Sequence, residues 1–424
     1  MTPGPPPPTR RTFGLLALGF AAFIVYGSWV PLNFRARPPA AAIDAFTTAM
    51  IERAAVDSRS DGVANVLIAV PLGFTLLAAV RADRPGRGRD IVVGAALLPA
   101  CVGLAVGVEF GQVFLPSRTC SGSDVWCQGL GAALGMGAWV VAGRPLTGQA
   151  RAVWGRTRDG GVAGRVLLAY LGLLAVVQVL PLDLSPSPKD LYKKLRDEVR
   201  VVPFGEFRGA DENRAWAAGA KEIKLAGLFA PAGLLAAALP GRFWVGFPRA
   251  AVAAAGLAVG MEAIQLVVQS RSPGATDVVV GTAGALIGWG VGRRGRAGVF
   301  GVAWAAALVV AYWEPFDFRA PAAAFDWTPG MPFESGNPLF AFEEMLTKLV
   351  LFGLVGAAVG GRRPVLAAGV GLCVAAAIEA GQCFLHSHTP GVTDVLLGGG
   401  GAFAGAWVAG RVAGRDSTRP AGVY

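Results

Sequence analysis

The chain has 424 residues, of which 54% are hydrophobic and only 16% are charged, and its formal net charge is +10. This composition excludes an ordinary soluble globular protein, because such a protein would carry more charge on its surface. The basic excess does not indicate nucleic-acid binding either, since the charges lie between apolar runs and are not interleaved with aromatic residues.

Apolar runs recur along nearly the whole chain, each of roughly the 20 residues that a helix needs to cross a bilayer. A Pro-rich tail (1–11) precedes the first run, which lacks a clear cleavage site and which we interpret as a retained anchor. We therefore predict an all-α integral membrane protein with about twelve transmembrane helices. The predicted spans are 12–32, 63–80, 91–115, 125–142, 163–181, 222–240, 248–269, 276–292, 297–313, 340–360, 364–385 and 392–412, followed by a second tail, 413–424.

The distribution of arginine predicts the orientation of the chain in the membrane. With the N-terminus in the cytoplasm, the inner segments contain many arginines and few acidic residues, which are Asp83, Asp90, Asp159 and Asp416. Short loops rich in Lys and Arg stay on the cytoplasmic side. We therefore predict a multi-pass protein of a bacterial-type cytoplasmic membrane, with both termini in the cytoplasm.

A pattern of four polar residues occurs three times, always with spacings of 3, 6 and 6 residues. Arginine holds the third position in two copies, and histidine replaces it in the last. Such internal repetition is the signature of a chain built from repeated structural units. The three sets are Glu109, Gln112, Arg118 and Asp124; Glu262, Gln265, Arg271 and Asp277; and Glu379, Gln382, His388 and Asp394.

Further shared residues give the limits of the repeats. Each Asp is followed by two glycines four residues apart, and each first span ends near a Pro-Leu/Phe-Asn/Asp sequence. We predict three four-helix repeats at residues 12–142, 163–292 and 297–412. Because each has an even number of spans, the copies run parallel, around an axis along the membrane normal. The glycines, which we expect to pack helices closely, are Gly131, Gly135, Gly284, Gly288, Gly401 and Gly405.

The pattern P-[LF]-[DN], then a span with a PLG-like turn, then E-x-x-Q-x5-R-x5-D with spaced glycines, resembles the VanZ-like family. The resemblance covers nearly the whole chain, as three tandem copies of a unit that usually occurs once. Family members often have Asn four residues after the Asp, where this chain has Gln128, Gly281 and Gly398. The namesake of the family is associated with low-level resistance to the glycopeptide teicoplanin, so the resemblance implies a role at the cell envelope.

The four-residue pattern is the candidate polar site. Glu and Gln three residues apart lie on one helix face, and a carboxylate inside a membrane span is a functional candidate by default. The arginine is the expected partner of the glutamate, because its planar guanidinium can bind a carboxylate through two hydrogen bonds. Three interpretations stay open: a structural clasp between the third and fourth spans, an outward-facing pocket for an anionic or amphipathic headgroup, and general acid–base catalysis by the glutamate.

Other candidate sites are weaker. Cys120 and Cys127 flank one short loop, where a disulfide or two unpaired thiols are both open. His386 and His388 lie near Glu379 and would suit a metal, but the other repeats offer no counterpart, so we predict neither a metal nor a cofactor. The sequence has no Walker loop, no dinucleotide fingerprint after a strand, no HExxH motif and no serine nucleophile elbow.

Together these patterns predict a membrane protein that acts at the cell envelope through an outward-facing polar site. We expect membrane lipids as partners, with a lipid-linked or anionic envelope ligand and no nucleic acid, and an effect on susceptibility to teicoplanin-type antibiotics. Two alternatives stay open, a transporter or flippase of an amphipathic substrate and a membrane enzyme acting on a lipid headgroup. The pattern favours a protein that is not an enzyme, and it leaves the oligomeric state open.

The predicted orientation can be tested with a reporter enzyme that is active only in the periplasm, fused after Tyr424. We expect the fusion to be silent, because the arginines of the last inner segment hold that end in the cytoplasm. A second fusion in the 116–123 connection should be active. Strong activity of the Tyr424 fusion would reverse the orientation and move the polar site to the cytoplasmic face.

Overall fold

The computed structural model describes residues 7–29, 32–52, 59–84, 86–159, 161–180, 188–239, 246–266, 268–320, 323–329 and 338–413. These residues are helical almost throughout, and the extended pairing among them is limited to isolated bridges such as Arg200 with Gly274 and Asp326 with Gly391. The all-α prediction is confirmed for this part of the chain. The C-terminal tail beyond Ala413 and residues 1–6 lie outside the described residues.

Nine of the described helical segments are long and apolar enough to cross a membrane, and the shorter apolar helix Ala297–Trp313 is similar in character. The chain is therefore a multi-pass helical membrane protein. The predicted spans 222–240 and 340–360 coincide with two further helices that carry several charges in their first halves. The nine segments are Arg10–Trp29, Gly62–Arg81, Arg87–Gln112, Gly122–Ala152, Gly161–Val179, Phe247–Gln265, Ala275–Arg294, Pro364–Gln382 and Val392–Ala413.

The chain divides into two compact units, which we call the N-terminal unit (mainly residues 1–156) and the C-terminal unit (mainly residues 157–424). The N-terminal unit contains the predicted repeat 12–142, and the C-terminal unit contains the predicted repeats 163–292 and 297–412. The helices of the N-terminal unit are α1 (Arg10–Trp29), α2 (Pro39–Glu52), α3 (Arg59–Arg81), α4 (Arg87–Gln112), α5 (Gly122–Ala138), continued by the π-turn Trp139–Gly143, and α6 (Arg144–Asp159).

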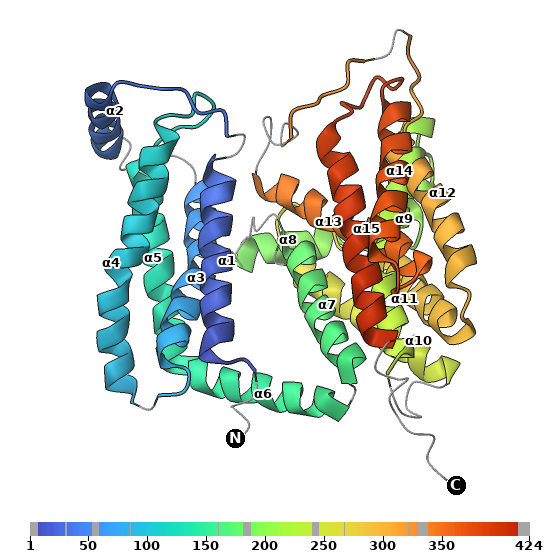
Figure 1. Ribbon diagram of the computed structural model, residues 1–424, viewed down its shortest axis with the longest axis horizontal. Coiled ribbons are helices and arrows are strands. Elements are labelled where there is room, and N and C mark those ends of the chain that lie inside the picture. The colour runs from blue at the N-terminus through green and yellow to red at the C-terminus, as the bar shows by residue number, and fades with distance from the viewer. Residues whose placement is uncertain are drawn as a thin grey trace. The chain divides into compact units, whose positions relative to one another are not determined.

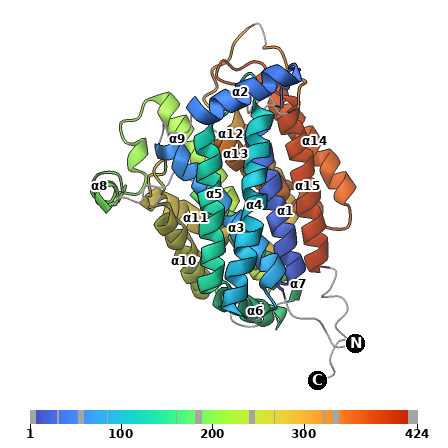
Figure 2. The same cartoon turned by 90° about the vertical axis from the view of Figure 1, so that its left-hand side faces the viewer.

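In the N-terminal unit, α1, α3, α4 and α5 run side by side, with α2 across one end and α6 across the other (Figures 1 and 2). The core between them includes Phe13, Ile24, Leu77 and Trp139. At the end near α6, the buried carboxylate of Asp90 accepts hydrogen bonds at 2.6 Å from both Arg81 and Arg144. These arginines, which the sequence analysis used only to predict orientation, therefore also fasten α3 and α6 to the start of α4.

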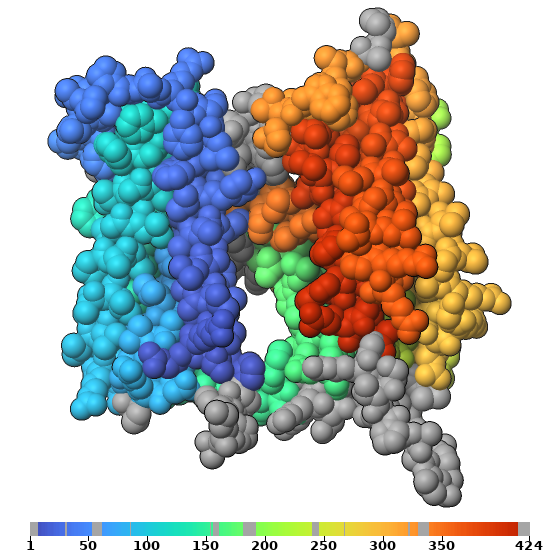
Figure 3. All heavy atoms as spheres, in the orientation of Figure 1, coloured from blue at the N-terminus to red at the C-terminus, as the bar shows by residue number. Residues whose placement is uncertain are grey.

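The C-terminal unit contains the remaining helices. They are α7 (Gly161–Val179), α8 (Pro188–Asp197), α9 (Glu212–Ala237), α10 (Phe247–Gln265), α11 (Ala275–Arg294), α12 (Ala297–Trp313), α13 (Pro338–Val359), α14 (Pro364–Gln382) and α15 (Val392–Ala413). One core lies among α7, α9, α10 and α11 and another among α12, α13 and α14. The side chains of α14 and α15 (orange to red) form a continuous surface along one face of this unit (Figure 3).

Each predicted span overlaps one described helix, with ends that differ by a few residues, or by ten at the start of α9. The helices α2, α6 and α8 lie outside the predicted spans. They were missed because hydropathy detects only runs long enough to cross a bilayer, whereas α2 is a short helix and α6 and α8 are rich in charged residues.

The spaced glycines lie where two helix backbones touch. A Cβ added to Gly131 or Gly135 of α5 would collide with backbone carbonyls of α3, those of Val66 and Val70. The same collision recurs in two other helix pairs. It involves Gly284 with Ala226 and Gly288 with Ala230 between α11 and α9, and Gly401 with Leu349 and Gly405 with Gly353 between α15 and α13. Contacts this close are possible only where neither residue presents a side chain between the helices.

This packing gives a test on a single helix. Gly284→Ala and Gly288→Ala should each destabilise the folded protein by about 1–3 kcal/mol, because the added methyl group forces two backbones apart. Gly290→Ala on the same helix is the matched control, since an added Cβ there meets nothing within 4 Å. Thermal unfolding in detergent measures the difference. Equal melting temperatures for all three variants would show that α9 and α11 do not pack as described.

Candidate functional site

The three repeated glutamates hold the connection between the third and fourth helices of each predicted repeat. Their side chains are buried, with 1%, 7% and 3% of the surface exposed at Glu109, Glu262 and Glu379. Each accepts a hydrogen bond from the backbone N–H twelve residues later, Ser121 at 2.8 Å, Gly274 at 3.0 Å and Gly391 at 2.8 Å. These amides lie at the start of α5, α11 and α15, where backbone N–H groups lack helical partners and a negative charge is stabilising.

The predicted pairing of this glutamate with the arginine is wrong. Arg118 donates to the backbone carbonyl of Gly27. Arg271 donates to the carbonyl of Leu180 at 3.2 Å and pairs with the carboxylate of Glu343 on α13. The arginines therefore link the helix connection to other elements, and the backbone amide takes their expected place beside the glutamate.

The glutamines are buried beside the glutamates. Gln382 donates to the carbonyl of Tyr312 at 2.7 Å, and Gln112 lies against the carbonyl of Ser28, the corresponding residue of the first predicted repeat. In both cases the contact joins the third helix to the end of the first. Gln265 is 4% exposed and lines a polar cavity described below.

Lysines that the sequence analysis did not select pair with two of the three aspartates. The ammonium group of Lys221 lies 2.7 and 2.8 Å from the two carboxylate oxygens of Asp277, and that of Lys348 lies 2.6 Å from Asp394. Both lysines lie in the charged first halves of α9 and α13, whose second halves are apolar, and a charge in such a helix was the available signal for them. Asp124 has a different neighbour, the hydroxyl of Ser123, 3.4 Å away.

His388 does not stand in for arginine beside its glutamate. Its Nδ1 lies 2.9 Å from the hydroxyl of Ser387, which donates to Asp317. Burial lowers the pKa of His388 below its ordinary value, although the nearby carboxylates of Glu314 and Asp317 act in the opposite direction.

Cys120 and Cys127, which flank one short loop, are free thiols. Cys120 hydrogen-bonds to the carboxylate of Glu109 and is buried beside it, and Cys127 lies on α5. Among the described residues, the set of side chains that could hold a metal consists of three carboxylates. It includes neither His386 nor His388.

A polar cavity of about 450 Å³ lies inside the C-terminal unit, between elements of its two predicted repeats. Three members of the four-residue pattern line it, Gln265, Arg271 and Asp277. Arg200, Lys221 and Lys224 add positive charge, and Glu314 and Glu343 add negative charge. Because cavities that bind small molecules span about 300–1,000 Å³ and combine apolar walls with a few polar groups, this one is large enough for a headgroup.

Lys224 differs from the other cations of this cavity because no described carboxylate lies within 4 Å of its ammonium, although Glu344, Glu314 and Asp394 act on it from farther away. Lys221 pairs with Asp277 and Arg271 pairs with Glu343, whereas Lys224 forms no ion pair with any residue that the structure describes. Its ammonium group lies 4.6 Å from the centre of the Tyr312 ring, a cation–π contact. An aromatic ring leaves the ammonium positive and able to attract an anion.

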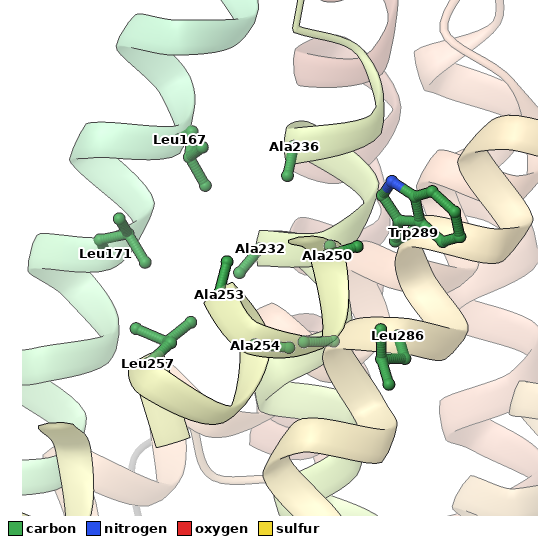
Figure 4. Close-up of a pocket in the computed structure, with 12 residues that line it drawn as sticks. Leu167, Leu171, Ala232, Ala236, Ala250, Ala253, Ala254, Leu257, Leu286 and Trp289 are labelled. Carbon is green, nitrogen blue, oxygen red and sulfur yellow. The ribbon is translucent and has the colours of Figure 1, made fainter. Parts of the chain in front are cut away.

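A second cavity of the same unit has the opposite character. Leucines of α7 face small side chains of α9 and α10 across it, with Trp289 of α11 at one side (Figure 4). It measures about 130 Å³, and its labelled lining residues are leucine, alanine and tryptophan. This cavity offers no charged group, so a headgroup site belongs to the polar cavity.

The helical fold, the apolar spans and the glutamate-fastened connections define a polytopic helical membrane protein with a repeated polar constellation. A family model described as VanZ/LLP1 matches two segments, residues 13–143 and 167–296, which together make up more than half of the chain. The chain belongs to the VanZ/LLP1 family, as the sequence pattern predicted. No curated protein and no solved structure matches it.

The hydrogen bond of the glutamates predicts how substitutions behave. Glu262→Gln and Glu379→Gln keep an oxygen that can accept from Gly274 or Gly391, so both should fold nearly as well as the wild type. Glu262→Leu and Glu379→Leu leave a buried N–H unpaired and should cost about 1–3 kcal/mol. Thermal unfolding in detergent measures this, and an equal loss for the Gln and Leu variants would show that the carboxylate charge, not the amide bond, is what matters.

Proposed function

We propose that residues 297–412 form a third unit of the same kind as the two matched segments. Several contacts of the N-terminal unit support this, because they recur there at corresponding residues. Trp29 and Trp313 donate to the carbonyls of Val108 and Ile378, both at 3.0 Å, and Leu32 and Phe316 share a left-handed backbone conformation. Arg35 and Arg319 donate through their backbone N–H groups to Phe114 and Phe384, both at 2.7 Å.

We also propose that the chain binds an anionic headgroup of a membrane amphiphile in the polar cavity. The observation that carries this proposal is the convergence of Arg271, Lys221 and Lys224 on one cavity. Two of these cations are already paired, and Lys224 supplies the attraction for a phosphate or carboxylate. Arg271 contributes directional donors, because a guanidinium can bind an anion through more than one hydrogen bond.

Binding, rather than transport or catalysis, fits the distribution of polar groups. The polar lining gathers where α10 meets α11 and at the first halves of α9 and α13, while the remainder of these helices is apolar. A transport path would need polar groups farther along the helices. Placed by the arginine rule on the outer side of a cytoplasmic membrane, the cavity would receive lipids or lipid-linked envelope precursors and so affect susceptibility to teicoplanin-type glycopeptides.

The test is native mass spectrometry of the full-length protein in mild detergent, which detects the lipids that co-purify. We expect an anionic lipid on the wild type, and at least a tenfold lower occupancy for Lys224→Gln and Arg271→Gln, because each removes a positive charge from the cavity. Lys193→Gln is the matched control, since it removes an exposed lysine of α8 outside the cavity. The proposal fails if the wild type retains no anionic lipid, or if all three variants retain it equally.

A further inference from the structure

Three carboxylates of the C-terminal unit converge beside the polar cavity. Glu206 lies in the 3-10 turn Gly205–Phe207, Glu222 in the first half of α9, and Asp277 in the first turn of α11. One oxygen of each carboxylate lies within 4.8 Å of the others. Two of these residues, Glu206 and Glu222, belong to no repeated sequence pattern.

The loop that carries Glu206 is fastened to the start of α11. Arg200 exchanges backbone hydrogen bonds with the connection before α11, donating to Pro273 at 3.1 Å and accepting from Ala275 at 2.8 Å. The hydroxyl of Thr276 accepts from the N–H of Phe204 at 2.8 Å. Glu206 is therefore held near Asp277 by contacts other than those of its own carboxylate.

The carboxylate of Glu222 is buried, and the group within hydrogen-bond reach of it is another carboxylate, that of Glu206. The residue is 8% exposed, and neither of its side-chain oxygens has a donor in the described part of the chain. Lys221 forms an ion pair with one oxygen of Glu222 at 3.5 Å, but its ammonium lies closer to both oxygens of Asp277. One oxygen of Glu206 is also buried and unpartnered. Buried carboxylate oxygens are costly unless a hydrogen bond or a cation compensates them.

The charges already present do not balance this cluster. Three carboxylates face two basic groups, Lys221 on Asp277 and Arg200 on Glu206, the latter at 3.0 Å. The excess negative charge lies at Glu222, where the unpartnered oxygens are. A bound cation would supply both the missing charge and the missing contacts.

We propose that Glu206, Glu222 and Asp277 bind a divalent cation. The ligands are all carboxylate oxygens, without nitrogen or sulfur, which favours a hard cation. The ligand oxygens lie within 4.8 Å of one another, so one ion can contact all three. Magnesium demands near-ideal octahedral geometry, whereas calcium accepts irregular sets of carboxylates, so three side chains from three separate elements suit calcium better. Asp277 and Lys221 also line the neighbouring cavity, but the cation requires no headgroup there.

Lys221 makes the site testable in both directions. Its ammonium occupies both oxygens of Asp277, so calcium must displace it, and about half of its side-chain surface is exposed. Removing this competing charge with Lys221→Gln should strengthen calcium binding about tenfold. Glu222→Gln and Glu206→Gln remove ligand charge and should weaken it at least tenfold.

The experiment is isothermal titration of CaCl₂, and separately MgCl₂, into the full-length protein in detergent after removal of lipid. Glu212→Gln is the matched control, because it removes an exposed carboxylate from the same helix. We expect calcium to bind more tightly than magnesium, and calcium to raise the melting temperature of the wild type and of the control but not of Glu222→Gln. If Glu222→Gln does not fold, Glu206→Gln and Lys221→Gln provide the same test.

The rival explanation is a proton shared between Glu206 and Glu222, which would also compensate their oxygens. In that case the folded wild type binds no calcium at millimolar concentration, and Lys221→Gln does not change this. Either that result or unchanged calcium binding by both Glu206→Gln and Glu222→Gln would overturn the proposal. Because lipid is absent from the titration, failure here leaves the headgroup proposal standing.

Discussion

The structure of each predicted repeat depends on one buried hydrogen bond, between a glutamate near the end of the third helix and the backbone N–H that opens the fourth. An apolar helix end would leave that N–H unpaired in a region with little water, at a cost comparable to that of a lost hydrogen bond. Glu109, Glu262 and Glu379 remove this cost, and the helix start in turn stabilises their charge. The short connection is thereby fixed, and the residues between the two helices, including Arg118 and Arg271, occupy defined positions.

The second helix of each predicted repeat packs against the fourth at glycine residues. There the backbones of the two helices are in direct contact. The first helix then packs against the third in two ways. Trp29 and Trp313 lie over Gly111 and Gly381, whereas the corresponding sequence positions of the second predicted repeat hold Val179 and Ile264. The second repeat therefore has neither the tryptophan nor the glycine of this contact.

Much of this architecture was readable from the sequence, because both repeated constraints require particular residue types. A helix–helix contact through backbone needs glycine, and a buried helix start needs an acceptor, so the spacing of Glu109 and Gly131 recurs in every copy. The hydrogen-bond and ion-pair partners of the charged residues could not be predicted from the sequence. The amide of Ser121 carries no residue signature, and the ion pair of Arg271 with Glu343 joins two repeats whose relative position the sequence does not determine. Glu206 was missed for the same reason, since a long loop brings it to α11.

The repeats differ most where ligands would bind. Counted from the glycine of the second helix, Lys348 corresponds to Asn65, which accepts a hydrogen bond from the amide of Gln128 at 3.0 Å. The N-terminal unit thus has a neutral amide pair where the third predicted repeat has the ion pair of Lys348 with Asp394. Lys221, Lys224 and Glu222 likewise concentrate charge on α9. Charged groups in membrane helices are costly unless they are paired or face water or a ligand. Their concentration on α9 and α13 places the charges of the proposed headgroup site in the second and third predicted repeats, while the first keeps the glutamate and glycine contacts.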